Sequence, residues 1–241
     1  MAALTSFAEN GCALVIGAEG GIGAALLAHA QEHGGFAQVL GGSRRSDPPL
    51  DITQEAQVAA AAAQLRERLV HAGHTLRAVI VATGFLHGRG WQPEKTWQQL
   101  DADHLAHSFA VNAIGPALVM KHFLPLLPRE GKSVLACLSA KVGSIGDNQL
   151  GGWYGYRASK AALNQLVHTA AIELRRRQPE ALCLALHPGT VDTGLSTPFA
   201  KSGLKVQTPA EAAAALWSTL DRLDATASGR FWTQHGEPLP W

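Results

Sequence analysis

The sequence predicts an α/β fold in which a doubly wound parallel sheet carries helices on both faces. Short apolar runs alternate along the chain with longer stretches of helical periodicity. The first run, residues 12–18, is continuously apolar, as a strand buried on both faces should be. Strand–helix alternation of this kind gives βαβ units with right-handed crossovers. The chain of 241 residues shows no internal repeat or linker, so we expect residues 1–241 to form a single domain.

The other elements follow from the same two patterns. Strands are expected at the short apolar runs 37–40, 50–52, 78–82, 133–138, 182–186 and 230–233. Helices are expected where apolar residues recur every three or four positions, at 22–31, 56–70, 101–127, 156–177 and 209–220. Ligands bind such a sheet beyond the carboxyl ends of its strands, and the residues of chemical interest here follow those ends.

Composition excludes several classes of function. Lys and Arg number 20 against 19 Asp and Glu, a net charge of +1, so nothing indicates nucleic acid or an anionic membrane as a partner. Hydrophobic residues make up 46% of the chain, which is enough for a large core. The 11 histidines are scattered without the spacing of a metal site.

The cysteines and the N-terminal sequence favour a cytoplasmic protein. Each cysteine lies in a short apolar run, which indicates buried thiols in a reducing compartment: Cys12, Cys137 and Cys183. The N-terminus lacks a basic segment followed by an apolar core, and no apolar stretch looks long enough to span a bilayer.

A glycine-rich turn follows the first strand and opens the first helix. Its glycines, Gly17, Gly21 and Gly23, are spaced Gly-x-x-x-Gly-x-Gly. Glycine lets the backbone turn tightly and approach a pyrophosphate, which then rests on the helix N-terminus. The alternative is a tight turn without a ligand, but the strand before and the helix after favour a dinucleotide site in a Rossmann-type fold.

The second strand ends in basic rather than acidic residues. An acidic residue there would bind the ribose 2′-hydroxyl of NAD, whereas arginine accommodates the 2′-phosphate of NADP. Ser43 and Arg44 stand at this position, and the next acidic residue is Asp47. We therefore expect NADP(H) to be preferred over NAD(H), although a solvated arginine pair is the alternative. Asp51 could accept a hydrogen bond from the adenine amino group or could be a turn residue, and both remain open.

Tyr156 and Lys160 begin the longest helical pattern. Residues four apart lie on the same face of a helix, so a phenol and an ammonium are expected side by side. A neighbouring cation favours phenolate and should lower the tyrosine pKa from about 10. Taken alone, this spacing is common by chance.

Asn112 precedes Pro116 by four residues within the helical pattern 101–127. Proline has no N–H to donate, so the Asn112 carbonyl would lose its helical partner and accept from water instead. A proline kink without a chemical role is the alternative.

Together these motifs resemble those of the short-chain dehydrogenase/reductase family over nearly the whole chain. The matching residues are Gly17, Gly21, Gly23, Asn112, Tyr156, Lys160, Pro188, Gly189 and Thr193. The stretches 93–95, 111–116, 151–154 and 240–241 are similar to the carbonyl-reductase-like branch that contains the bacterial C-factor proteins.

The resemblance implies hydride transfer between NAD(P)H and a carbonyl or alcohol. Tyr156 would be the acid–base group, Lys160 would bind the nicotinamide ribose and tune the tyrosine, and Asn112 would complete a proton relay. These three would also contact the cofactor, with Gly17, Gly21, Ile22, Gly23, Ser43, Arg44, Asp51, Ile52, Ala82, Thr83, Gly84, Pro188, Gly189, Val191 and Thr193. Residues 194–206 would form a mobile lid, and Trp153 and Phe199 are candidate pocket walls or plain core aromatics.

The chain departs from the family pattern at two points. The family's Asn-Asn-Ala-Gly after the fourth strand is replaced by the sequence at 81–84, which lacks asparagine. The family serine orients the substrate oxygen, but Ala140 stands at its usual position. Ser139, directly after a strand, is the preferred candidate, and Ser144 is the alternative.

Two functions follow from these observations. The first is an NADPH-dependent carbonyl reductase acting on a small carbonyl or alcohol compound, with an apolar aromatic or aliphatic carbonyl as the default substrate. The second is an NADP(H)-binding protein that acts by signalling, as proposed for C-factor-like proteins. The helices around Asn112 and Tyr156 are apolar on more than one face, so we also expect a homodimer or homotetramer.

Overall fold

The computed structural model describes residues 4–195 and 206–241. Within these residues the strands form one six-stranded sheet in the order β2-β1-β3-β4-β5-β6, and every neighbouring pair is parallel. The strands are β1 (Gly11–Ile16), β2 (Gln38–Gly42), β3 (Thr75–Val81), β4 (Ser133–Leu138), β5 (Ala181–His187) and β6 (Phe231–Thr233). This arrangement confirms the predicted doubly wound parallel sheet.

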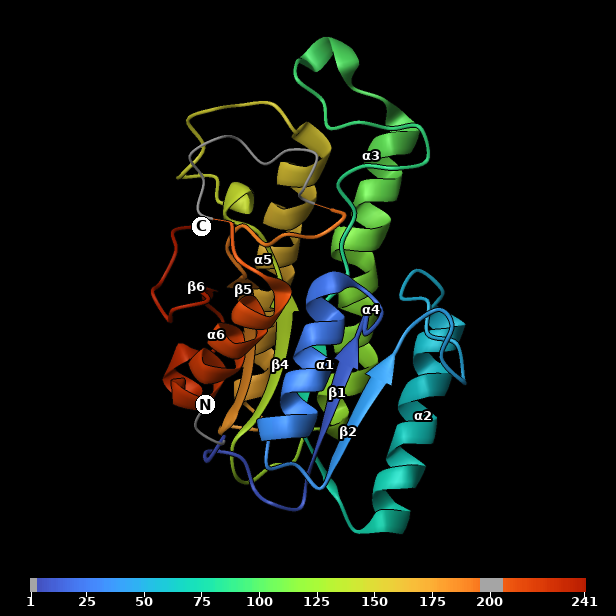
Figure 1. Cartoon of the computed structure of the whole chain (residues 1–241), viewed down its shortest axis with the longest axis vertical. Helices are drawn as coiled ribbons and strands as arrows, with labels where there is room; N and C mark the ends of the chain where they lie inside the picture. The colour runs from blue at the N-terminus through green and yellow to red at the C-terminus, as the bar shows by residue number, and fades with distance from the viewer. Residues whose placement is uncertain (1–3, 196–205) are drawn as a thin grey trace.

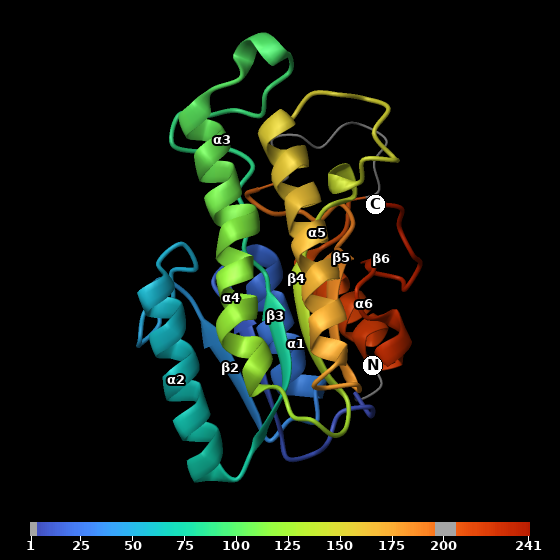
Figure 2. The ribbon, with the colours of Figure 1, turned by 180° about the vertical axis from the view of Figure 1, so that it is seen from behind.

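Helices cover both faces of the sheet (Figures 1 and 2). One face carries α1 (Gly21–His33) and α6 (Pro209–Arg222), and the other carries α2 (Glu55–Ala72), α4 (Gly115–Phe123) and α5 (Tyr154–Arg175). Alternate residues of β1 point to opposite layers: Ala13 and Val15 pack with Leu26 of α1, while Leu14 packs with Phe123 of α4. Burial on both faces explains why the strand is continuously apolar.

The strand expected at 50–52 is wrong, because this segment is a turn. The Asp51 carboxylate accepts hydrogen bonds from the Thr53 N–H at 2.9 Å and the Thr53 hydroxyl at 2.7 Å. The Asp51 N–H donates to Gln57 Oε1 at 2.9 Å instead of to a neighbouring strand. Aspartate favours such side-chain-to-backbone turns over strands. Among the described residues, β2 therefore forms an edge of the sheet.

The helix expected over 101–127 is interrupted near Asn112. It comprises α3 (Ala102–Phe109), a π-helical turn at Ala110–Ile114, α4 and a 3₁₀ turn at Leu124–Leu126. The Asp101 side chain caps α3, and the Gly115 N–H reaches back five residues to the Ala110 carbonyl. Pro116, which has no N–H, follows this wider turn, so the structure confirms an irregular helix at Asn112.

The run Ala102–Leu126 is, within the described residues, the one helix long and apolar enough to cross a membrane by length and composition. The expectation that no stretch reaches this length is therefore wrong. Val119, Met120 and Phe123 from this run are buried in the core beneath α4, which accounts for much of its apolar character.

The predicted buried thiols are confirmed, since all three cysteines are free and buried. Burial raises the pKa of Cys12 to about 11, that of Cys137 to about 12 and that of Cys183 well above its usual value. Within the described residues, further short 3₁₀ turns lie at Trp97–Gln99, Lys141–Gly143 and Ala225–Ala227.

Candidate active site

Tyr156 and Lys160 lie in the first two turns of α5, as their spacing predicts. Lys160 is 2% exposed, and its ammonium donates to the Leu138 carbonyl at the end of β4 at 2.8 Å. Its Nζ lies 5.9 Å from the centroid of the Tyr156 ring. The helix and the end of β4 therefore hold the phenol and the ammonium on one side of the site.

The predicted lowering of the tyrosine pKa is wrong for this structure. Burial raises the pKa of Tyr156 to about 12. Burial also lowers the pKa of Lys160 to about 8, because its charged form loses water. The phenol is therefore protonated near neutrality, because desolvation disfavours its charged form.

Asn112 connects the π-helical turn to the end of β3 and to α5. Its Oδ1 accepts from the Phe85 N–H and its Nδ2 donates to the Phe85 carbonyl, both at 2.8 Å. The same Nδ2 donates to Ser159 Oγ at 3.0 Å, and the Ser159 hydroxyl donates to the Tyr156 carbonyl. A Cβ placed on Gly84 would lie 3.7 Å from Asn112 Oδ1 and 3.8 Å from Lys160 Nζ, so both side chains border the space beside Gly84.

The two candidate serines are both buried and hydrogen-bonded to other parts of the chain. The Ser139 hydroxyl donates to Asn164 Oδ1 at 2.7 Å. The Ser144 hydroxyl donates to the Trp241 carbonyl at 3.2 Å and accepts from the Asp147 N–H at 3.1 Å. Each hydroxyl hydrogen is directed to a protein acceptor, so the choice between the serines stays a prediction.

The glycine-rich turn has the shape that a pyrophosphate requires. Gly17 has a φ of +88°, and a Cβ on Gly23 would lie 2.0 Å from the Gly17 carbonyl oxygen, so both positions need glycine. A Cβ on Gly21 would lie 2.8 Å from Thr193 Cγ2, which places the distant Thr193 beside the turn. Gly20 gives α1 no side-chain cap, so the first-turn N–H groups, including that of Ile22, remain available to an anion.

The end of β3 supplies a second feature that fits a cofactor. A Cβ on Gly17 would lie 2.9 Å from the Ala82 carbonyl oxygen and 3.1 Å from Thr83 Cγ2, so these residues adjoin the glycine-rich turn. The Thr83 hydroxyl is buried and has no hydrogen-bond partner among the residues described. A bound polar ligand would satisfy it, and these features together fit a dinucleotide such as NAD(P).

The residues after β2 form a charged group beside the same turn. Arg45 Nε lies 2.7 Å from Glu19 Oε2, and the Arg45 N–H donates to Ser43 Oγ at 3.0 Å. The hydrogen bond from Arg45 contributes most to holding the pKa of Glu19 below its usual value. Burial opposes ionisation of Asp51, but its bonds from Thr53 and the charges of Arg44 and Arg89 keep its pKa low. The ion pair with Arg45 gives a structural reason for the acidic residue, Glu19, in the glycine-rich turn.

The last of the predicted cofactor-contacting residues are Ile52 and those in the segment after β5. Ile52 is buried, and its Cδ1 would lie 2.7 Å from a Cβ on Gly115. Gly189 has a φ of +79°, the Pro188 carbonyl accepts from Gln207 Nε2 at 2.6 Å, and Val191 is bridged to Gln207. Phe199 and most of the expected lid lie outside the described residues.

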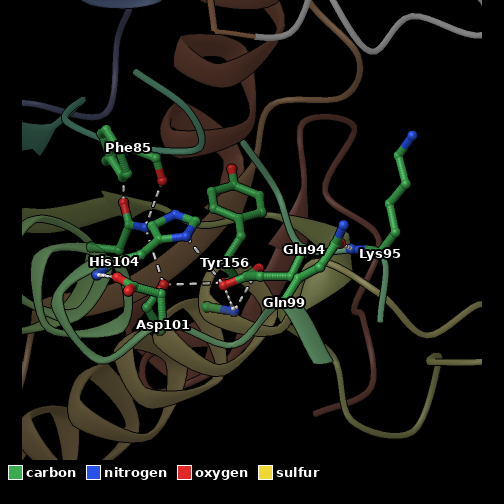
Figure 3. A network of polar contacts seen from close by, with 10 residues as sticks. Phe85, Glu94, Lys95, Gln99, Asp101, His104 and Tyr156 are labelled. Carbon is green, nitrogen blue, oxygen red and sulfur yellow. Dashed lines mark hydrogen bonds and ion pairs between the residues drawn. The ribbon is translucent and has the colours of Figure 1, made fainter. Parts of the chain in front are cut away.

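Trp153, which the sequence offered as a pocket wall or a core aromatic, contacts Tyr156 edge-to-face at 6.2 Å between ring centroids. Two further side chains near Tyr156 were not predicted from the sequence. Glu94 and His104 form a buried polar pair that Figure 3 shows with Tyr156 in the same network. A glutamate followed by a distant histidine has no recognisable spacing, so only the folded structure reveals the pair. Within 4–195 and 206–241, no cluster of three or more His, Cys, Asp or Glu side chains is placed to hold a metal.

The fold and these groups define a dinucleotide-binding α/β protein with a Tyr–Lys–Asn site. Residues 2–226 match a family model described as enoyl-(acyl carrier protein) reductase. A Rhodococcus 1-hydroxy-2-glutathionyl-2-methyl-3-butene dehydrogenase is 32% identical over 237 residues, covering 95% of this chain and 98% of that protein. The chain belongs to the short-chain dehydrogenase/reductase family of oxidoreductases.

Two further similarities agree with the carbonyl-reductase-like branch. C-signal from Myxococcus xanthus is 35% identical over 143 residues, which cover 59% of this chain and 81% of that protein. The crystal structure of NADPH-bound carbonyl reductase from chicken fatty liver superposes with a TM-score of 0.82 at 25% identity, covering 96% of this chain and 94% of that one.

Proposed function

We propose that this protein is an NADPH-dependent oxidoreductase that transfers hydride between nicotinamide and a carbonyl or alcohol substrate. The observation that carries the proposal is that Asn112 and Lys160 border Gly84, beside a glycine-rich turn, while the Lys160 ammonium also lies next to the Tyr156 ring. The NADPH-bound chicken carbonyl reductase supports the same cofactor and reaction class.

The cofactor would rest on Gly17, Gly21, Ile22, Gly23 and the other strand-end residues predicted above, and it would supply or accept the hydride. Tyr156 is protonated near neutrality, because burial raises its pKa, and its phenol donates a proton to the carbonyl oxygen in reduction. Lys160 places a positive charge near the phenol and favours its ionisation as the proton leaves. Asn112 fixes the backbone at both Phe85 and, through Ser159, Tyr156.

NADP(H) is the preferred cofactor in this proposal. The carboxyl end of β2 carries Ser43, Arg44 and Arg45 and no acidic residue. The Glu19 carboxylate pairs with Arg45, whereas the charge of Arg44 acts on Glu19 and Asp51 without an ion pair among the described residues, so we assign Arg44 to the 2′-phosphate.

A second candidate function is NADP(H)-linked signalling with little turnover. It is favoured by the similarity to C-signal and by the hydrogen bonds that already engage both serine hydroxyls. The discriminating experiment measures NADPH oxidation by the purified protein against aldehydes, ketones, quinones and aldehydes bearing a glutathionyl group. Turnover of any of these above the rate without substrate supports the reductase, and its absence across the panel favours signalling.

We further propose a cytoplasmic homodimer or homotetramer that acts on small molecules and has no nucleic-acid or membrane partner. The free buried thiols and the net charge of +1 agree with this assignment. Helix α5 carries exposed apolar side chains that a second subunit could cover, with Ile172 50% exposed and Leu166 37% exposed.

A further inference from the structure

The segment between β3 and α3 reaches the start of α5 through Glu94. The Glu94 backbone carbonyl accepts from the Trp153 N–H at 2.5 Å, and its carboxylate oxygens lie 3.2 and 3.3 Å from the Gly155 N. Trp153 is the N-cap of α5, in a left-handed conformation with a φ of +52°, and Gly155 immediately precedes Tyr156. Glu94 therefore holds the backbone directly before the tyrosine, as Figure 3 shows.

The Glu94 carboxylate is buried together with His104. The two side chains are 1% and 4% exposed, and Glu94 Oε1 lies 3.4 Å from His104 Nδ1. A buried carboxyl group needs hydrogen-bond partners that replace the water it loses. The Gly155 N–H and the His104 imidazole are placed to provide them here. His104 is itself fixed, because its backbone N–H donates to Asp101 Oδ1 at 2.7 Å and its ring stacks on Trp91.

Gly155 makes this approach possible. A Cβ at position 155 would lie 2.9 Å from Glu94 Oε1 and 3.3 Å from Ser108 Oγ, so any other residue would push the carboxylate away from the helix. The glycine is unfavourable for a helix by propensity alone. The close contact with the Glu94 carboxylate explains why glycine stands at position 155, in the first turn of α5.

We propose that Glu94, held by His104, is a positioning residue that sets the orientation of Tyr156 through the first turn of α5. The inference rests on the proposed function, in which Tyr156 donates the proton. Glu94 acts through the backbone: the Tyr156 hydroxyl is directed away from its carboxylate (Figure 3). A catalytic group displaced by about 1 Å can lose about a hundredfold in rate, so loss of this contact lowers turnover without removing the cofactor site.

The test compares Glu94→Ala, Glu94→Gln and Gly155→Ala with Lys95→Ala as the matched control. The neighbouring Lys95 is exposed, and its side chain extends away from the network (Figure 3). Glutamine can still accept from the Gly155 N–H and donate its amide hydrogen to a neutral His104 Nδ1. Three quantities are measured for each variant: kcat with a carbonyl substrate, the Kd of NADPH, and hydrogen exchange of the peptide covering 150–158.

Glu94→Ala and Gly155→Ala should lower kcat by about ten- to a hundredfold and keep the Kd of NADPH within about twofold. In both variants the amide hydrogens of the peptide 150–158 should exchange faster than in the wild type. Glu94→Gln should recover most of kcat, and Lys95→Ala should match the wild type. A Glu94→Gln variant as slow as Glu94→Ala, or a folded Gly155→Ala variant with unchanged kcat and exchange, would overturn the proposal. If Glu94→Ala does not fold, the Gly155→Ala variant alone tests the proposal. It displaces the carboxylate with a residue that favours the helix, so it does not weaken the helix by propensity.

The proposed function fails by a different result. If Tyr156→Phe keeps full activity, the proton-donor role is lost, while the exchange of 150–158 still reports whether Glu94 holds the helix start. If Tyr156→Phe is inactive and the Glu94 and Gly155 variants behave as wild type, the function stands and the positioning role is refuted.

Discussion

Lys160 donates a hydrogen bond from its ammonium to the backbone carbonyl of Leu138 at 2.8 Å, and this contact ties α5 to the end of β4. The lysine is almost fully buried, and burial lowers its pKa to about 8. Its charge is therefore present at neutral pH but is lost within the range in which the enzyme can be assayed.

The pH dependence of carbonyl reduction should follow this lysine. A cation with a lowered pKa is charged below that pKa and neutral above it, so the rate should fall as pH rises through about 8. Tyr156, with a pKa of about 12, stays protonated throughout. Lys160→Arg keeps its charge, so its rate should not decline between pH 8 and 10, even if it is lower overall. A decline of equal size in both proteins would assign it to another group.

Asn112 should matter for stability as well as activity. Asn112→Ala removes both hydrogen bonds to the Phe85 backbone, and a buried group left unpaired costs about 1–3 kcal/mol. Urea unfolding should therefore show a lower free energy of unfolding than in the wild type. Asn10→Ala, at an exposed asparagine, is the control and should change it little. Equal stability of both variants would contradict the role of this contact.

The two serines can be separated by substitution. A serine that contacts the substrate oxygen should cost kcat strongly when it becomes alanine, whereas one bonded only within the protein should chiefly lower stability. We expect Ser139→Ala to show the larger loss of kcat, because Ser139 directly follows β4. Steady-state kinetics on both variants check this expectation. A strong effect at Ser144 alone would reverse the assignment, and no effect at either would leave Tyr156 as the sole side-chain donor.

Arg44→Ala should discriminate between the two cofactors. Only NADPH carries the 2′-phosphate, and a lost charge-assisted hydrogen bond is worth about 1.5–3 kcal/mol, or about ten- to a hundredfold in affinity. NADH binding should be nearly unchanged. Arg45→Ala is the matched comparison, and it should have a smaller effect because Arg45 already pairs with Glu19. Titrations that show equal losses of NADPH and NADH in Arg44→Ala would contradict the assignment.

The sequence predicted the structure best at positions where the fold accepts only one kind of residue. Buried parallel strands must be apolar on both faces, and Gly17 and Gly23 occupy positions that a side chain could not, so both the sheet and its glycine-rich turn could be predicted. The spacing of Tyr156 and Lys160 placed them on one helix face for the same reason.

The strand predicted at 50–52 was wrong because it rested on the local apolar pattern alone. Leu50 and Ile52 are indeed buried, but the Asp51 side chain competes for the backbone and makes a turn. The predicted lowering of the Tyr156 pKa was wrong, because burial, which depends on the whole fold, raises that pKa. Glu94 and His104 come together through tertiary contacts that no local spacing encodes.

The central claim is that the Tyr156 phenol transfers the proton, and the activity of Tyr156→Phe tests it most directly. The measurement is NADPH oxidation with a carbonyl compound that the wild type reduces well, beside the Kd of NADPH for both proteins. We predict that the variant binds NADPH within about twofold of the wild type and loses about 10²–10⁴-fold in kcat, the usual contribution of a positioned general acid. Full activity of Tyr156→Phe on that compound would contradict the account and would favour the signalling function instead.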